Sequence, residues 1–114
     1  KKYKKWCDEY FYLPHRKESR GIGGIFFDYK KNNFEKDFQF VRDVGVTFQL
    51  IFNKIIRKKI KKKWTIKDKE MQYIKRGRYT EFNLLYDRGT KFGLQTAGNV
   101  EGILMSLPPL AKWK

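Results

Sequence analysis

An amphipathic pattern over residues 34–60 constrains the fold of this chain more than any other feature. Apolar residues recur there at steps of three and four, the spacing of one helical face: Phe34, Phe38, Val41, Phe48, Phe52 and Ile55. Asn32 and Asn33 precede the pattern and can cap a helix. Lysines from Lys58 onward suit the C-terminal end, where the helix dipole favours cations. The pattern predicts one long helix, and Gly45 on its stripe would let another element pack closely.

Shorter helices are predicted on both sides of this pattern. Residues 2–12 have helical spacing, and Pro14 ends that helix because the residue before a proline avoids the helical conformation. Residues 68–75 form another, with Asp68 as its cap and Gly77 as its stop. Residues 100–107 suit either a short helix or a strand.

Three strands complete the prediction. Residues 20–28 are apolar on both faces, which is typical of a strand buried on both sides. Residues 78–87 alternate, and residues 91–96 would return beside them after a turn at 87–90. The expected fold is therefore a single α+β domain over residues 1–114, with an antiparallel sheet flanked by helices.

Composition excludes several classes of protein. The chain has 114 residues, a net charge of +15 and one cysteine, Cys7, so an internal disulfide framework is excluded. No apolar run approaches the roughly 20 residues of a transmembrane helix. No secretory signal is visible, so a cytoplasmic location is expected. The charge attracts anions of three kinds: nucleic acid, an anionic membrane or a polyanionic small molecule. The lysine-rich stretch 54–69 is interpreted as a solvated surface.

Several sequence runs stand in the order of one known family. They are WCDEYF, HR and RGIGGIFFD within residues 6–28, then RGRY-EFNL-YDRGT-FGLQT and ILMSLPP within residues 76–109. These runs resemble the C-terminal part of aerobic, oxygen-dependent coproporphyrinogen III oxidase. The resemblance weakens over residues 50–68 and covers less than half of a family member. It implies a flat antiparallel sheet between helices and a homodimer, with residues 79–114 as the dimerisation region.

The resemblance also implies an activity. The family enzyme converts two propionates of coproporphyrinogen III to vinyl groups, which gives protoporphyrinogen IX in haem synthesis. Molecular oxygen is the co-substrate, no organic cofactor is needed, and bacterial members have been associated with a divalent metal. The family's catalytic motifs lie in the N-terminal half, so no catalytic residue is expected here. The isolated chain is therefore expected to be inactive.

Site residues are carried over from the family one by one. Ala97, Gly98 and Asn99 match a Gly-Gly-Arg triplet that contacts the tetrapyrrole, but Asn99 lacks the charged donor of the usual arginine. Gly102 stands where a serine is usual. Arg20 lies in the glycine-rich segment and is expected to face a propionate. His15 matches a candidate metal ligand of bacterial members; taken alone, it is a surface or loop histidine.

Other polar or reactive residues are given structural interpretations. Cys7 beside Trp6 is expected to be a small buried hydrophobe. Glu81, Asp87 and Arg88 are expected to form salt bridges. Arg76 and Arg78 could reach propionates or a sheet edge. The glycines of 20–28 lack the third glycine of a dinucleotide fingerprint, so nucleotide binding is not expected.

Two further functions remain open from the sequence. One is a small basic nucleic-acid-binding protein, which the charge and the interleaved aromatic residues favour, although no recognition motif is present. The other is a non-catalytic remnant of the oxidase, which the changes at Asn99 and Gly102 favour.

Overall fold

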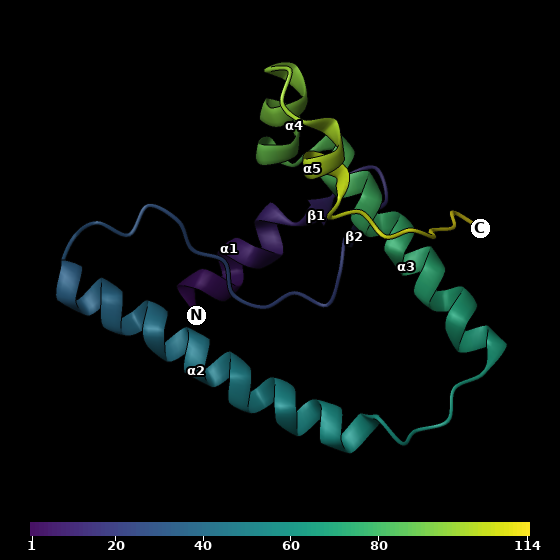
Figure 1. The fold of residues 1–114 in the computed structure, drawn as a ribbon, viewed down its shortest axis with the longest axis horizontal. Helices are drawn as coiled ribbons and strands as arrows, with labels where there is room; N and C mark the ends of the chain where they lie inside the picture. The colour runs from purple at the N-terminus through teal and green to yellow at the C-terminus, as the bar shows by residue number, and fades with distance from the viewer. The chain divides into compact units, whose positions relative to one another are not determined.

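A computed structural model describes residues 1–114 as five helices and one two-stranded antiparallel sheet. The elements, drawn in Figure 1, are α1 (Lys2–Tyr10), β1 (Tyr12–Leu13), β2 (Glu18–Ser19), α2 (Phe34–Lys59), α3 (Ile66–Leu85), α4 (Arg88–Gln95) and α5 (Val100–Leu104). Helices together with a small antiparallel sheet are consistent with the predicted α+β class. Contacts divide the chain into an α2 unit, Phe27–Trp64, and an α3 unit, Lys1–Phe26 with Thr65–Lys114.

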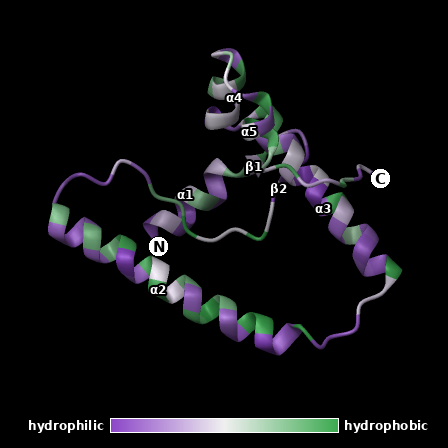
Figure 2. Cartoon of the chain, viewed as in Figure 1, coloured by the Kyte–Doolittle hydropathy of each residue, from purple (hydrophilic) through white to green (hydrophobic).

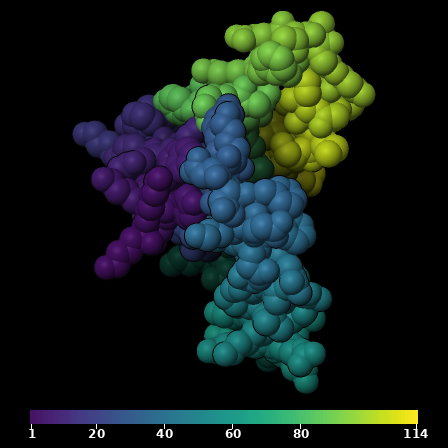
Figure 3. All heavy atoms as spheres, turned by 90° about the vertical axis from the view of Figure 1, so that its left-hand side faces the viewer, coloured from purple at the N-terminus to yellow at the C-terminus, as the bar shows by residue number.

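Helix α2 confirms the predicted long helix. The side chain of Asn33 accepts a hydrogen bond from the Lys36 amide at 3.0 Å and so caps the first turn. Acidic residues occupy the first turn and basic residues the last, which suits the helix dipole at both ends. Green, apolar residues recur along α2 in Figure 2, and its side chains are the blue-to-teal spheres of Figure 3. None of them is buried, and Phe34 is 77% exposed.

Helix α3 corrects two predictions, the short helix 68–75 and the strand 78–87. It begins at a capping box, in which Thr65 accepts from the Asp68 amide and Asp68 accepts from the Thr65 amide. It then runs through Gly77 to Leu85. Tyr79, Phe82 and Tyr86 also fall at helical steps, so the pattern fits either structure. A helix satisfies its own backbone groups, whereas a strand here would need a partner that the fold does not provide.

The segment after α3 is helical as well, so the predicted strand 91–96 is wrong. The carboxylate of Asp87 accepts a hydrogen bond from the Thr90 amide at 2.7 Å and caps α4. Asp87 therefore opens a helix where a hairpin turn was expected. Asn99 caps α5 in the same way, which shows that a short helix begins at Val100.

The predicted strand 20–28 is an irregular segment without a ladder partner. Gly23 and Gly24 have φ angles of 90° and 155°, which side-chain-bearing residues rarely adopt. At the end of the glycines, the Phe26 amide donates to the Tyr3 carbonyl at 3.0 Å. The expected partner strands are helices, so the segment has no ladder to join.

The core of the α3 unit lies where α1, the β1–β2 hairpin and α3 meet. Leu13 and Phe82 are fully buried, and Cys7 is 4% exposed, which confirms the expectation of a buried cysteine. The rings of Tyr10 and Phe11 pack against Phe82. Phe26 contacts both of these rings and also that of Trp6, which extends the aromatic cluster. Helix α1 stops at Tyr10, shortly before Pro14, close to the predicted end. None of the helices combines the length and the apolar character that crossing a bilayer requires.

Candidate functional site

Helix α3 presents two rows of side chains to the N-terminal segment. Residues three apart lie on one face of a helix, and they give a charged row of Lys75, Arg78 and Glu81. A second face carries an aromatic row of Tyr79, Phe82 and Tyr86, with Asn83 beside it. The β1–β2 hairpin contacts the charged row, and Arg20, which follows the hairpin, contacts the aromatic row.

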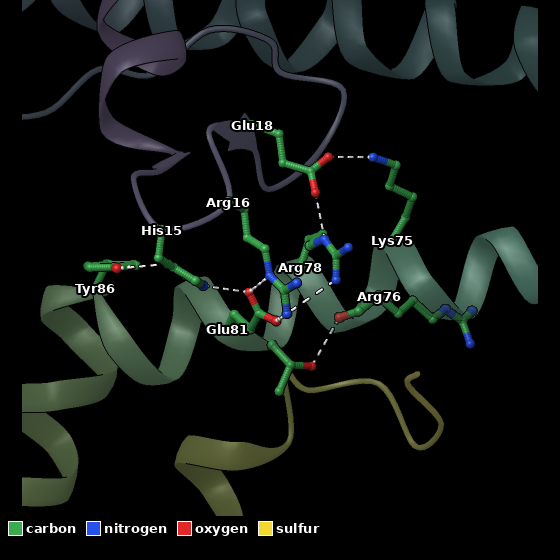
Figure 4. A network of polar contacts seen from close by, with 9 residues as sticks. His15, Arg16, Glu18, Lys75, Arg76, Arg78, Glu81 and Tyr86 are labelled. Carbon is green, nitrogen blue, oxygen red and sulfur yellow. Dashed lines mark hydrogen bonds and ion pairs between the residues drawn. The ribbon is translucent and has the colours of Figure 1, made fainter. Parts of the chain in front are cut away.

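Glu81 is the centre of the charged contacts (Figure 4). Its two carboxylate oxygens accept from Arg16, at 2.6 and 3.0 Å, while its side chain is only 10% exposed. His15 Nε2 lies 2.7 Å from the same carboxylate. The hydrogen bond from Arg16, aided by that of His15, outweighs desolvation and lowers the pKa of Glu81 to about 2. Glu81 is therefore a carboxylate at neutral pH, which confirms its predicted salt-bridging role.

His15 has a protein partner at each ring nitrogen. Nε2 faces Glu81, and Nδ1 lies 2.9 Å from the hydroxyl of Tyr86, as Figure 4 shows. The structure holds no group of three or more His, Cys, Asp or Glu side chains that could bind a metal ion. The residues around His15 therefore do not fit a metal by themselves. His15 as a ligand stays a prediction that requires further ligands from outside this chain.

A second carboxylate, Glu18, continues the network. It accepts from Lys75 at 2.7 Å and from Arg78 Nε at 2.6 Å. Both hydrogen bonds lower the pKa of Glu18, and the bond from Lys75 has the larger effect. Arg78 thus lies between Glu18 and Glu81, and its buried Nη1 atom is 3.9 Å from Glu81 without a hydrogen bond. Arg78 has a structural role here, and Arg76 contributes its backbone carbonyl to Thr80.

The guanidinium of Arg20 lies against the aromatic row. Its central carbon is 4.1 Å from the ring centroid of Phe11, 4.7 Å from that of Tyr79 and 5.0 Å from that of Phe82. Its Nη1 atom donates to the side-chain oxygen of Asn83 at 3.3 Å. Ring faces attract a cation, and a guanidinium stacks on them well. Arg20 is therefore held in place while it keeps its charge.

A cavity of about 360 Å³ lies beside Arg20, between α1, α3 and the glycine-rich segment. Polar groups on its wall come from Asp8, Ser19 and Arg20, and rings come from Phe11, Phe26 and Tyr79. Asp8 is paired with Lys4 at 2.6 Å. The cavity thus offers aromatic surface and one cation, a combination that suits an aromatic or pyrrole-like group carrying a carboxylate.

The turn of Ala97, Gly98 and Asn99 lies elsewhere, between α4 and α5, and lines no part of that cavity. Ala97 has a φ of 55°, and Gly98 packs closely on the carbonyl of Gly93 and on Ile103. The Asn99 side chain accepts from the amides of Glu101 and Gly102 at 3.1 and 3.3 Å. Its side-chain oxygen is therefore occupied in capping α5. The structure does not bring this turn together with Arg20.

Comparison with known proteins identifies the family. The family model described as coproporphyrinogen III oxidase matches residues 1–114. The chain belongs to the coproporphyrinogen III oxidase family. Similar proteins come from Rickettsia rickettsii strain Sheila Smith, R. bellii strain OSU 85-389 and R. akari strain Hartford, at 65%, 64% and 63% identity over 113 residues. Each of these relatives is described as an oxygen-dependent coproporphyrinogen-III oxidase.

The chain spans 40% of the length of these coproporphyrinogen III oxidases, while the alignments include 98% of the chain itself. The resemblance predicted from the sequence is confirmed, and so is its extent of less than half of a family member. Residues 50–68, where the predicted resemblance was weakest, lie inside the matched range.

Two residues of this candidate site were not predicted from the sequence. Asn83 is 6% exposed and bonds Arg20 across 63 positions of the chain. Tyr86 bonds His15 across 71 positions. The spacing of Tyr79, Phe82, Asn83 and Tyr86 at helical steps was the available signal, and it was missed because this segment was assigned to a strand.

Proposed function

We propose that this chain acts as part of an oxygen-dependent coproporphyrinogen III oxidase. The observation that carries the proposal is identity of 63–65% with three relatives of that description across nearly the whole chain. The activity is the oxidative decarboxylation of two propionates to vinyl groups, with molecular oxygen as co-substrate and without an organic cofactor. A divalent metal belongs to the proposal only with ligands from outside this chain.

Within that reaction, Arg20 binds a propionate carboxylate of coproporphyrinogen III. A guanidinium can donate two parallel hydrogen bonds to a carboxylate, and the bonds are strengthened by charge. The cavity beside Arg20 is at the small end of ligand pockets, which run from about 300 to 1,000 Å³. It therefore suits one pyrrole ring with its side chains, and the rest of the tetrapyrrole extends beyond it.

The turn of Ala97, Gly98 and Asn99 provides a second, weaker contact to the same substrate. The side-chain NH2 of Asn99 is a neutral donor, so it replaces a charge-assisted bond by an ordinary one. The chain contributes no catalytic group to the reaction. The proton transfers that prime the substrate for oxygen require a base from the remainder of the enzyme.

The proposal includes the assembly of the enzyme. The complete enzyme contains an antiparallel sheet between helices, and this chain forms one part of that enzyme. Residues 79–114 form a contact between two copies in a homodimer, and the enzyme works in the cytoplasm. Light scattering at high protein concentration measures the assembly, and a monomer mass there would count against the dimer.

A chimeric enzyme tests the function directly. The matching segment of the R. bellii relative is replaced by this chain, and formation of protoporphyrinogen IX under oxygen is measured. We expect the chimera to be active and the isolated 114-residue chain to be inactive. An inactive but folded chimera would contradict the proposal, and the non-catalytic remnant would then be the better description. A chimera with Arg20→Ala serves as the control for substrate contact, because it is expected to raise KM.

A further inference from the structure

Two kinds of interaction hold the Arg20 guanidinium: contacts with aromatic rings and one hydrogen bond. They constrain the guanidinium in different ways. The rings of Phe11, Tyr79 and Phe82 attract the cation but leave it free to turn in its own plane. The hydrogen bond to Asn83 is directional, because a carbonyl oxygen accepts along its lone pairs. Of the groups around Arg20, Asn83 is therefore the one that selects which nitrogen of the fork faces α3.

The burial of Asn83 and the neutral charge of its amide both matter for its contact with Arg20. An amide that is 6% exposed needs a hydrogen-bond partner, since an unpaired buried polar group is costly. The charge of the acceptor matters as well. A carboxylate at position 83 would neutralise Arg20, whereas the neutral amide oxygen orients the guanidinium and leaves its positive charge available.

We infer that Asn83 is a positioning residue that orients Arg20 for a carboxylate in the cavity between α1, α3 and the glycine-rich segment. The inference rests on the proposed function, because a propionate is the carboxylate concerned. A guanidinium has five N–H donors, and Asn83 takes one of them, at Nη1. The others remain for the ligand. Asp8, the acidic side chain on the cavity wall, is paired with Lys4, so it does not compete for Arg20 through a bond of its own.

The orientation of Arg20 is measured first, without any ligand. Nitrogen-15 NMR of the whole chain at low temperature resolves guanidinium protons when rotation about the Arg20 bonds is slow. We expect resolved signals in the natural chain and averaged signals in Asn83→Ala. The matched control is Asn53→Ala, an exposed asparagine in α2, which should leave them resolved. Averaged Arg20 signals in the natural chain, at a temperature where the fold is intact, would overturn the inference.

Binding measurements then test whether the orientation of Arg20 increases the affinity for a carboxylate ligand. The probe is coproporphyrin III, the oxidised form of the substrate, with its tetramethyl ester as the uncharged comparison. We expect Arg20→Ala to weaken binding of the acid about tenfold and Asn83→Ala about threefold. Asn83→Asp should weaken it at least as much as Arg20→Ala, because it removes the free charge. Binding of the ester should change little in all three variants.

A double-mutant cycle separates positioning from a direct or purely structural role. If Asn83 acts through Arg20, Asn83→Ala has no further effect once Arg20 is alanine. Additive losses, or equal losses for acid and ester, would overturn the inference. Circular dichroism checks folding; if Asn83→Ala does not fold, Asn83→Ser and Asn83→Asp complete the same cycle. If all three fail to fold, Asn83 is a structural residue and the inference is wrong.

The outcomes distinguish the inference from the function on which it rests. No binding of coproporphyrin III to the natural chain, or binding insensitive to Arg20→Ala, contradicts the proposed substrate contact. Binding that depends on Arg20 but not on Asn83 leaves the proposed function standing and overturns only the inference.

Discussion

The backbone carbonyl of Lys112 fills the space beside Gly77 in which any other residue would carry its Cβ atom. The Lys112 amide also donates to the carbonyl of Tyr73 at 3.0 Å, so the C-terminal segment lies directly on α3. Gly77 is in the interior of a helix, where glycine costs about 1 kcal/mol relative to alanine. The close approach of Lys112 explains why the helix accepts that cost.

Gly77→Ala is therefore expected to destabilise the protein by about 1–3 kcal/mol despite the better helix propensity of alanine, because the C-terminal segment has to move. Urea unfolding measures the free energy of unfolding, and hydrogen exchange measures protection of the Lys112 amide. Gly45→Ala in α2 is the matched control. A Cβ atom there meets nothing within 4 Å, so it should be neutral or stabilising by up to about 1 kcal/mol. Equal effects of the two substitutions would refute the packing argument.

Removing the charge of Glu81 should be costly. Glu81→Gln leaves Arg16 and His15 without their carboxylate, and the α3 unit should lose about 2 kcal/mol of unfolding free energy. Chemical denaturation measures the loss. The control is Glu101→Gln in α5, an exposed position where the change should stay within about 0.5 kcal/mol. A Glu81→Gln protein as stable as the natural one would show that the network contributes little.

The same carboxylate gives a pH dependence with a definite sign. The pKa of Glu81 falls from its ordinary value of 4.5 to about 2 on folding, so its ionised form is the one that stabilises the fold. Its contribution is complete above about pH 5 and is lost as the pH falls towards 2. Unfolding free energies from pH 6 to pH 2 should therefore fall more steeply in the natural chain than in Glu81→Gln. Parallel curves for the two proteins are the contrary result. Glu18, whose pKa is also lowered, contributes in the same direction in both proteins.

An arginine at position 99 should change the stability of α5 and the affinity for substrate in opposite directions. Asn99→Arg removes the cap that serves the amides of Glu101 and Gly102 and should cost about 1 kcal/mol. It also restores a cation at the turn, so coproporphyrin III should bind more tightly, by about threefold or more. Thermal unfolding and fluorescence titration measure the two effects, with Asn99→Ala as the control that loses the cap alone. Unchanged affinity in Asn99→Arg would remove this turn from the proposed substrate contacts.

Elements whose signals are local could be predicted from the sequence. Helix α2 carries its cap at Asn33, its dipole-compatible charges and its apolar period within its own residues. The strand predictions were wrong because a strand depends on a partner elsewhere in the chain. The alternation at 78–87 was also compatible with a helix, and the helix that begins at the Thr65 capping box continues through these residues to Leu85.

In the candidate site, too, residues carried by local motifs could be predicted, whereas their distant partners could not. Arg20 and His15 were named because sequence motifs carry them, and Glu81 was expected to form salt bridges. The partners that orient them could not be assigned, since Asn83 and Tyr86 approach from more than 60 positions away. Asp87, also expected in a salt bridge, instead serves as a helix cap, and Arg88 lies over the ring of Tyr10 at 5.4 Å.

The buried thiol of Cys7 has a practical consequence. Cys7 is the only cysteine of the chain, and it lies on the wall of the cavity beside the glycine-rich segment. Because Cys7 is only 4% exposed, a thiol reagent reaches it only through a local opening of the fold, and the labelling rate reports how often that opening occurs. A carboxylate ligand bound in the cavity should cover Cys7 and slow the labelling, so the single cysteine can report ligand binding without any substitution.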